Sequence, residues 1–510
     1  MNVLFVNPNS ISKNYQALAS KYAAIETPTW ALLLAESCRS KGFKVGILDA
    51  NAEGLDPKES LKKIKSINPA FICLVVYGQN VNAGTTNMIG AMELANHIKS
   101  NEPDFKIGLI GSHIQALPKE TMQKEKNIDI GFINEGVYAL HNLLKLSELN
   151  VKNLRTVKGL ILRDKEKIFF TEPEKVVPQN RMDEDLPGYA WDLLPFNKKP
   201  LDLYRSPLWH AEYQDEFRSP YAAIQTSIGC QFKCSFCMIN IINKNDNEEI
   251  GVASNYSGMR FWSPEFIIKE FEKLFLLGVR TIKITDEMFL LNQKFYLPLC
   301  RLLAERNKDD LNKFWAYSRI DTVKRPEVLN IVRQAGIKWL CLGIESSNKN
   351  IRLEVSKGKF EDVDIKEIVK QIENCNINVM ANYIYGLPGD TKESIEETFK
   401  VSQDLNTLGW NTYAAMALPG SQLYSEALKN NTKIPKNYSE FSFLSFDTQP
   451  LPTASLTAAQ VLKLRDQKFN EYFSSEKFLN KIEKKFGKIA IDNIINMLKI
   501  KLERKIFNSK

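Results

Sequence analysis

Two series of alternating strand-like and helix-like segments limit what this chain can fold into. In residues 1–147, short apolar runs such as "VLFVNP", "KVGILDA" and "AFICLVVYG" alternate with segments of helical period. Strands joined through helices in this way run parallel in one sheet, with the helices on its faces. We therefore expect residues 1–147 to form an α/β domain with a doubly wound, Rossmann-like sheet.

The second series begins at residue 220. Its strand-like runs are "YAAIQTS", "TIKIT", "KFWAYS", "WLCLGIE", "VMANYIYG" and "NTYAAMAL", with helical patterns between them. Six strand and helix units are too few for a closed eight-fold barrel. The pattern therefore predicts a partial (β/α)6 barrel over residues 220–430, whose ligands would bind where the strands end.

Two further regions have a different character. Residues 148–219 contain a hairpin pattern around Asp164–Lys167 and then a Pro-rich irregular stretch, which indicates a linker. Residues 431–510 form a basic, helical C-terminal region, in which residues 476–510 hold ten Lys or Arg and four Asp or Glu. Apolar residues recur there at roughly helical spacing, as expected for amphipathic helices packed on the body: Phe478, Ile482, Phe486, Ile489, Ile495 and Leu498.

The charge pattern and the hydropathy also limit the partners and the compartment. The net charge of +8 arises mostly in the tail, so the body lacks the basic stripe of a nucleic-acid-binding protein, and we expect no nucleic acid partner. Contact of the tail with an anionic partner or a membrane surface is the alternative to simple packing. No segment has the length of apolar sequence that a transmembrane helix needs, and "MNVLFVNPNS" does not look like a signal peptide. We expect a cytoplasmic protein.

Three of the eight cysteines stand in "SIGCQFKCSFC", directly after the first strand of the second series. Structural zinc takes four ligands, and no second pair follows Cys230, Cys234 and Cys237. A redox dithiol needs only the last two and leaves Cys230 unexplained. Three thiolates around an iron–sulfur cluster leave one iron open to a substrate or cofactor. The spacing favours the cluster, with zinc and the dithiol as alternatives.

This triplet, with Phe236 before its last cysteine, resembles the signature of radical S-adenosylmethionine (SAM) enzymes. The resemblance implies a four-iron, four-sulfur (4Fe-4S) cluster whose open iron binds SAM, and reductive cleavage of SAM to a 5′-deoxyadenosyl radical. It also implies an electron donor such as flavodoxin or ferredoxin. Residues at the strand ends would then bind SAM, and we expect this set to be Phe236, Asp286, Glu287, Arg319, Glu345, Ser346 and Ile384. The motif near Ile384 departs from the family pattern, because Asn382 replaces its first glycine.

The Rossmann-like domain before the barrel resembles the cobalamin-binding subgroup of these enzymes. Cobalamin domains of the mutases and methionine synthase carry Asp-x-His-x-x-Gly after the second strand, and here Asp49 and Gly54 flank Asn51 in place of the histidine. We expect cobalamin without a protein imidazole beneath cobalt, with His113 as the residue that could replace it. Other strand-end loops complete the expected corrin site, at Tyr77, Gly78, Gln79, Gly111, Ser112, His113, Glu135 and Gly136.

The resemblance implies a methyltransferase that adds a methyl group to an unactivated carbon of a small molecule, using methylcobalamin. Two alternatives remain: an oxidative cyclase or rearrangement enzyme with cobalamin, and a radical SAM enzyme whose first domain is only a scaffold. The sequence does not identify the substrate or the catalytic residues that would touch it. Trp191, Trp209, Trp262 and Trp315 could line its pocket, although buried tryptophans are more often part of a core.

Overall fold

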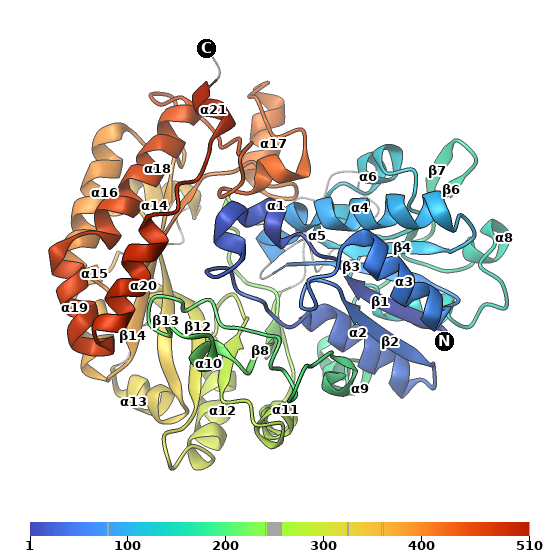
Figure 1. Ribbon diagram of the computed structural model, residues 1–510, viewed down its shortest axis with the longest axis horizontal. Helices are drawn as coiled ribbons and strands as arrows, with labels where there is room; N and C mark the ends of the chain where they lie inside the picture. Colours follow the sequence, from blue (N-terminus) through green and yellow to red (C-terminus); the bar gives the residue numbers. More distant parts are fainter. Residues whose placement is uncertain are drawn as a thin grey trace.

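The computed structural model describes residues 1–78, 81–239, 241, 258–323, 326–356, 358, 360 and 362–508. It contains two α/β units that lie side by side, the first in blue and the second in green to orange (Figure 1). The red C-terminal helices pack on the second unit, and the Asn493 carbonyl among them also accepts a hydrogen bond from Tyr22 of the first unit.

A seven-stranded sheet forms the first unit, in the order β2-β1-β3-β4-β5-β6-β7. Its parallel strands are β1 (Val3–Asn7), β2 (Val45–Asp49), β3 (Ile72–Val76), β4 (Ile107–Gly111) and β5 (Ile130–Phe132). The connecting helices are α2 (Thr29–Ser40), α3 (Pro57–Ile67), α4 (Gly84–Asn101), α5 (Ser112–Ala116), α6 (Pro118–Lys124) and α7 (Val137–Leu143).

Alternation along each strand explains why helices cover both faces of this sheet. Val3 and Phe5 of β1 join the hydrophobic core that includes α2 and α7, whereas Leu4 and Val6 join a second core with α3 and α4. Successive side chains of a strand point to opposite faces, so a strand of apolar residues needs cover on both. The doubly wound sheet that the sequence predicts is confirmed.

The hairpin expected in the linker belongs to the first sheet instead. Strands β6 (Leu160–Asp164) and β7 (Lys167–Phe170) form it, and β6 pairs antiparallel with β5. The edge of β5 would otherwise expose unpaired backbone groups, and the hairpin satisfies them. The first sheet therefore extends past the boundary expected at residue 147, and the irregular connection begins after Phe170.

The second unit is a curled sheet of six parallel strands, in the order β15-β14-β13-β12-β11-β8. Its strands are β8 (Tyr221–Ile224), β11 (Thr281–Ile284), β12 (Lys313–Arg319), β13 (Ile337–Glu345), β14 (Asn378–Tyr385) and β15 (Gly409–Ala414). The helices between them are α11 (Pro264–Leu276), α12 (Gln293–Glu305), α13 (Pro326–Gln334), α14 (Lys349–Val355), α15 (Ile365–Asn374) and α16 (Lys392–Leu405). The predicted partial barrel is confirmed.

Other parts of the chain cover both open edges of this barrel. At β8, the Thr27 hydroxyl of the first unit donates to the Ala223 carbonyl and accepts from the Ala223 N–H. At β15, Arg465 of helix α18 (Ala458–Phe473) donates to the Thr412 carbonyl at 3.0 Å. An open sheet edge presents unpaired donors and acceptors, and these contacts satisfy some of them. The first unit therefore lies against the β8 edge of the barrel, and α18 lies against the β15 edge.

The C-terminal region is helical as expected, but its apolar pattern does not continue through one helix. Phe478 and Ile482 of α19 (Glu476–Phe486) are buried, whereas Ile489 and Ile495 of α20 (Lys488–Leu498) are exposed. Gly487, at φ +83°, separates the two helices and changes the direction of the chain. The buried residues of α20 are Ala490, Asn493, Ile494 and Met497. No helix in the described part of the chain has the length and apolar composition needed to cross a bilayer.

Candidate active site between the two units

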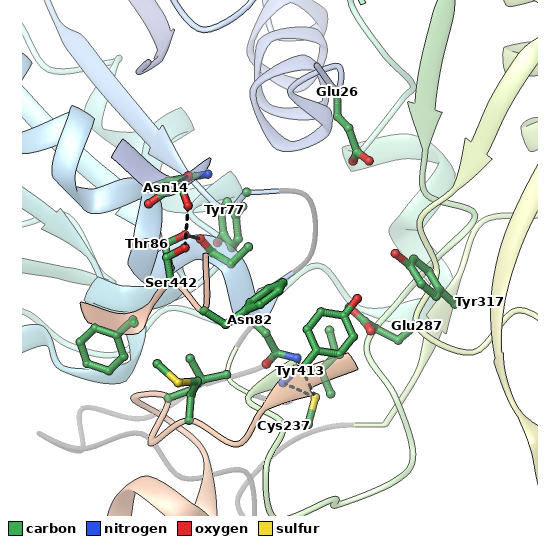
Figure 2. Close-up of a pocket in the computed structure, with 18 of the residues that line it drawn as sticks. Asn14, Glu26, Tyr77, Asn82, Thr86, Cys237, Glu287, Tyr317, Tyr413 and Ser442 are labelled. Carbon is green, nitrogen blue, oxygen red and sulfur yellow. Dashed lines mark hydrogen bonds between the residues drawn. The ribbon is translucent and has the colours of Figure 1, made fainter. Parts of the chain in front are cut away.

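A cavity of about 390 Å³ lies between the first unit and the mouth of the barrel (Figure 2). Its wall is built from the loops after β1, β2 and β3 on one side, and from the strand ends of the barrel on the other. Residues 441–444 of the C-terminal region add a third wall. Carboxyl ends of parallel strands from both units therefore face the same space, where ligands of open α/β sheets bind.

The three cysteines of the triplet line this cavity. The first barrel strand, β8, ends at Ile224, and a short strand β9 (Ser227–Ile228) follows it. β9 pairs with β10 (Arg260–Phe261), and the cysteine loop comes directly after β9. The Phe232 N–H donates to the Cys230 sulfur and the Ile239 N–H to the Cys237 sulfur, each at 3.4 Å. Such donors stabilise the negative charge of thiolates.

The donor set of this loop fits an iron–sulfur cluster. Burial raises the pKa of the thiols, to about 12 at Cys230 and to about 11 at Cys234, so binding of a metal must displace their protons. In the described part of the chain, no three Cys, His, Asp or Glu side chains converge closely enough to hold one metal ion. Three cysteines of one loop line the same cavity, which suits a cluster that offers one iron to each thiolate.

The two acidic residues expected to bind SAM after β11 point in different directions. Asp286 is buried and accepts three hydrogen bonds of 2.6 Å, from the N–H and hydroxyl of Thr226 and from the Ser227 hydroxyl. It holds the chain between β8 and β9, and it does not line the cavity. Glu287 does line the cavity, and burial raises the pKa of its carboxyl to about 7.

Arg319, at the end of β12, lines the cavity next to the cysteine loop. Its guanidinium forms two hydrogen bonds of 2.6 Å with Asp321, and its other terminal nitrogen lies 3.9 Å from the Cys234 sulfur. The rings of Phe232 and Phe360 lie 3.7 and 4.5 Å from the guanidinium. The side chain is thereby fixed, with one terminal nitrogen facing the Cys234 sulfur.

Glu345 is held toward the cavity by an unusual backbone conformation at the end of β13. Its φ is +65°, at an irregularity in the pairing of β13 with β14. This region is costly for residues other than glycine, and such strain is often found at functional sites. Gly343 leaves the room, since a Cβ there would lie 2.5 Å from a carboxylate oxygen of Glu345. Burial raises the pKa of the Glu345 carboxyl to about 7.

Of the other residues expected at SAM, two line the cavity and one does not. Phe236 and Ile384 line the cavity and pack against a small core under α14. Asn382, which replaces the glycine of the family pattern, lines the cavity and donates to the Leu342 carbonyl. Ser346 is buried outside it, where its hydroxyl is 3.2 Å from that of Thr398.

On the side of the first unit, Asn51, Tyr77 and Gly78 line the cavity. The Tyr77 ring stacks on Trp30, with 5.0 Å between the ring centroids, and Gln115 donates a hydrogen bond to its hydroxyl. Gly78 has φ +77°, and a Cβ there would lie 3.0 Å from the backbone of Ala83. These contacts give the cavity a flat aromatic wall beside a tight turn.

The other described residues expected at cobalamin do not line this cavity. Asp49 is buried and accepts from Asn7 and from the Tyr204 hydroxyl, both at 2.8 Å, so it ties the connecting segment to β2. His113 is buried too. Its Nδ1 lies 3.1 Å from the Thr85 hydroxyl, and its ring meets Tyr438 edge-on at 5.2 Å.

The other members of this set support the first sheet. Glu135 forms a buried ion pair with Arg260, 2.8 Å long. Gly111 packs against β3, since a Cβ there would lie 2.1 Å from the Val76 carbonyl oxygen. Ser112 begins α5, Gly136 precedes α7 with φ +80°, and Gly54 lies in an open turn. Gln79 lies outside the described residues.

Several cavity residues were not expected from the sequence. Trp30 lines the cavity. The four tryptophans that were considered for the pocket do not line it: Trp191, Trp209, Trp262 and Trp315. Tyr317 lies near Glu287, and Asn82 lies near Cys237 (Figure 2). Tyr413 also lines the cavity. Tyr317 and Tyr413 lie on β12 and β15. The alternation of side chains along these strands could have predicted from the sequence that both point to the barrel interior.

Comparison with protein families agrees with this division of the chain. Residues 224–401 match the radical SAM superfamily, and residues 15–144 match the B12 binding domain. The chain belongs to the cobalamin-binding radical SAM enzymes. The radical SAM domain implies a 4Fe-4S cluster and SAM, and the B12 binding domain implies cobalamin.

Relatives of this radical SAM enzyme have more than one activity in their names. It is 24% identical over 485 residues to an uncharacterized methyltransferase of Pyrococcus horikoshii, covering 94% of each chain. It is 23% identical over 475 residues to the anaerobic magnesium-protoporphyrin IX monomethyl ester cyclase of Cereibacter sphaeroides, covering 91% of this chain and 68% of the cyclase.

The fold is that of a solved radical SAM methyltransferase. The structure of TsrM from Kitasatospora setae, with cobalamin and a [4Fe-4S] cluster bound, superposes with a TM-score of 0.61 at 16% identity. The match covers 88% of this chain and 82% of TsrM.

Proposed function

We propose that this radical SAM enzyme is a methyltransferase that adds a methyl group to an unactivated carbon of a small molecule. The observation that carries the proposal is the single cavity, because it is lined by the cysteine triplet and by the strand-end loops of the B12 binding domain. When bound, the cluster with SAM supplies a radical that abstracts hydrogen, and cobalamin supplies the methyl group. One substrate in this cavity can meet both.

On the barrel side, the thiolates of Cys230, Cys234 and Cys237 hold the cluster. Glu287, Arg319 and Glu345 surround SAM with charged groups that suit its amino and carboxylate ends, and Phe236 and Ile384 pack against its adenine. Asp286 and Ser346 do not contact SAM in this proposal. They bind backbone N–H groups and so fix the chain that carries the SAM-binding residues.

On the other side, Asn51, Tyr77 and Gly78 contact the corrin. No described histidine lines the cavity, which supports a corrin without a protein imidazole: Asn51 stands at the position of the histidine, and His113 contacts Thr85 and Tyr438. Asp49 keeps the loop of Asn51 in place through its bonds to the Ala52 N–H and to Tyr204.

The similarity to the cyclase favours a second candidate, an oxidative cyclisation or rearrangement in the same cavity. In either case an electron donor such as flavodoxin or ferredoxin reduces the cluster. The reducing interior of the cytoplasm suits the thiols of the triplet and the buried free cysteines, and we propose this compartment.

The co-products of SAM separate the two candidates. We would incubate the anaerobically reconstituted protein with cobalamin, reductant and a metabolite extract, and measure S-adenosylhomocysteine and 5′-deoxyadenosine. A methyltransferase consumes one SAM to methylate cobalt and a second to make the radical, so both co-products accumulate in equal amounts. 5′-Deoxyadenosine without S-adenosylhomocysteine would contradict methylation and support the second candidate.

A further inference from the structure

One side chain of the B12 binding domain reaches the cysteine loop of the radical SAM domain. The Nδ2 of Asn82 donates a hydrogen bond to the Cys237 sulfur at 3.6 Å, and its Oδ1 accepts from the Met238 N–H at 3.0 Å (Figure 2). Asn82 lies in the short helix η2 (Val81–Ala83), directly before α4. The two domains therefore touch at a cysteine of the triplet.

The second hydrogen bond fixes the direction of the first. The side-chain amide of asparagine has one oxygen, which accepts, and one nitrogen, which donates. Because the Met238 N–H needs an acceptor, the oxygen faces it and the nitrogen faces the sulfur. Cys237 thus has two N–H donors, the backbone of Ile239 at 3.4 Å and the side chain of Asn82.

The surroundings of Cys237 make this donor important. Cys237 is half-buried and lines the cavity. The Asn82 amide is a donor that the protein holds in place at this sulfur. Hydrogen bonds to sulfur are among the factors that set the reduction potential of iron–sulfur clusters, because they stabilise the more negative reduced state.

We infer that Asn82 raises the reduction potential of the cluster by donating a hydrogen bond to its Cys237 thiolate, so that the B12 binding domain helps to make the cluster reducible. This rests on the proposed role of Cys237 as a cluster ligand. Asn82 is a positioning residue, since it acts through Cys237 and the backbone of Met238. The bond to the Met238 N–H can hold the cysteine loop in place, whereas the proposed effect on the potential comes from the bond to the Cys237 sulfur.

The test is a redox titration of the reconstituted full-length protein, without SAM, substrate or cobalamin, followed by the paramagnetic resonance signal of the reduced cluster. In Asn82→Ala, we expect the midpoint potential to move to a lower value. In Asn82→Asp, the acceptor for Met238 remains but the N–H donor is lost, and the potential should again fall. The new carboxylate also lowers the potential through its charge, so the potential of Asn82→Asp alone does not separate a lost hydrogen bond from an added charge. Asn82→Ala adds no charge, and a purely structural role predicts that the isotope effect of the exchangeable N–H on the cluster stays as in the wild type.

A second readout reports the hydrogen bond itself. Iron–sulfur stretching bands in the resonance Raman spectrum should shift in D2O, and this shift should become smaller in both variants, because an exchangeable N–H is lost. Asn87→Ala is the matched control: Asn87 lines the same cavity from α4, and its side chain bonds to Asn14 and not to a cysteine.

An unchanged potential in Asn82→Asp, with a D2O shift equal to that of Asn87→Ala, would overturn the inference. If Asn82→Ala fails to assemble a cluster, the D2O shift of Asn82→Asp still decides, because this variant keeps the bond to Met238. The measurement needs neither cobalamin nor substrate, so it stays independent of whether the enzyme methylates. Failure to bind any cluster in the wild type would overturn the proposed site as well.

Discussion

Glu26 of the B12 binding domain and Lys283 of β11 form a buried ion pair across the two domains. The Lys283 ammonium lies 2.9 Å from both carboxylate oxygens, and the two side chains are 7% and 1% exposed. The Tyr221 hydroxyl donates to the same carboxylate at 3.3 Å. Glu26 also lines the cavity, so the pair joins the cavity wall to the interior of the barrel.

Removal of one partner should destabilise the protein, because it leaves a buried charge alone. We expect Lys283→Met to lower the free energy of unfolding by about 3–5 kcal/mol, and Glu26→Gln in the same chain to restore much of the loss. Urea denaturation of the cofactor-free protein measures this. The matched control is Lys349→Met, which breaks an exposed pair with Asp362 and should cost at most about 1 kcal/mol. Equal effects of the two lysine variants would contradict the buried role.

The cysteine triplet should be essential for the cluster. We expect Cys234→Ala to lose the iron and sulfide of the reconstituted protein and all formation of 5′-deoxyadenosine, because alanine cannot ligate iron. Cys300→Ala, which removes a buried thiol of α12 away from the cavity, should keep both. Full activity in Cys234→Ala would remove this residue from the mechanism.

Glu212 should make stability depend on pH. Burial raises the pKa of its carboxyl to about 7, although the cations of Lys313 and Arg218 act in the opposite direction, and its Oε2 has no hydrogen-bond partner among the described residues. The folded state thus favours the protonated form. Below about pH 4 the carboxyl is protonated in both the folded and the unfolded state, and the free energy of unfolding is not reduced. As the pH rises from about 4 to 7, the unfolded chain releases the proton first, and the free energy of unfolding falls by about 1–3 kcal/mol.

Melting temperatures between pH 5 and 8 measure this contribution. In Glu212→Gln, which stays neutral, the decline over this range should be smaller than in the wild type. Parallel pH profiles of the two proteins would mean that Glu212 is not buried in its neutral form.

Cobalamin should bind without a nitrogen ligand from the protein. His113 is turned to Thr85 and Tyr438 outside the cavity, and burial lowers the pKa of its imidazole to about 3. We expect the paramagnetic resonance spectrum of the cobalt(II) form to show no axial nitrogen hyperfine splitting, with or without His113→Ala. A splitting that disappears in His113→Ala would contradict this account.

The fold could be predicted because its signal is local. Apolar runs with flanking turns identified the five parallel strands of the first sheet and the six of the second, and the order of strands and helices required parallel pairing. The hairpin β6–β7 was found, but its partner was not, because the choice of a sheet edge depends on long-range contacts that leave no periodic pattern. The sequence allowed for more than one amphipathic helix in the tail, but it did not locate the break at Gly487, where the apolar face changes direction.

The site was only partly predictable. Glu287 and Asp286 are neighbours in the sequence, yet one faces the cavity and the other holds Thr226, and this depends on where β8 ends. Asn51 and Tyr77, which were expected from their loop positions, line the cavity. His113 and Glu135 instead contact Thr85 and Arg260 outside it. Asn82 has no motif of its own, because its partner lies 155 residues further along the chain.

The most direct test of the proposed function follows the methyl group itself. The reconstituted enzyme would be incubated with cobalamin, reductant, a metabolite extract and SAM that carries a trideuterated methyl group, and the products would be analysed by mass spectrometry. The account predicts a small molecule that gains one intact trideuteromethyl group, only when both the cluster and cobalamin are present. A product that loses hydrogen and gains no label, or a labelled product that forms equally without cobalamin, would contradict it.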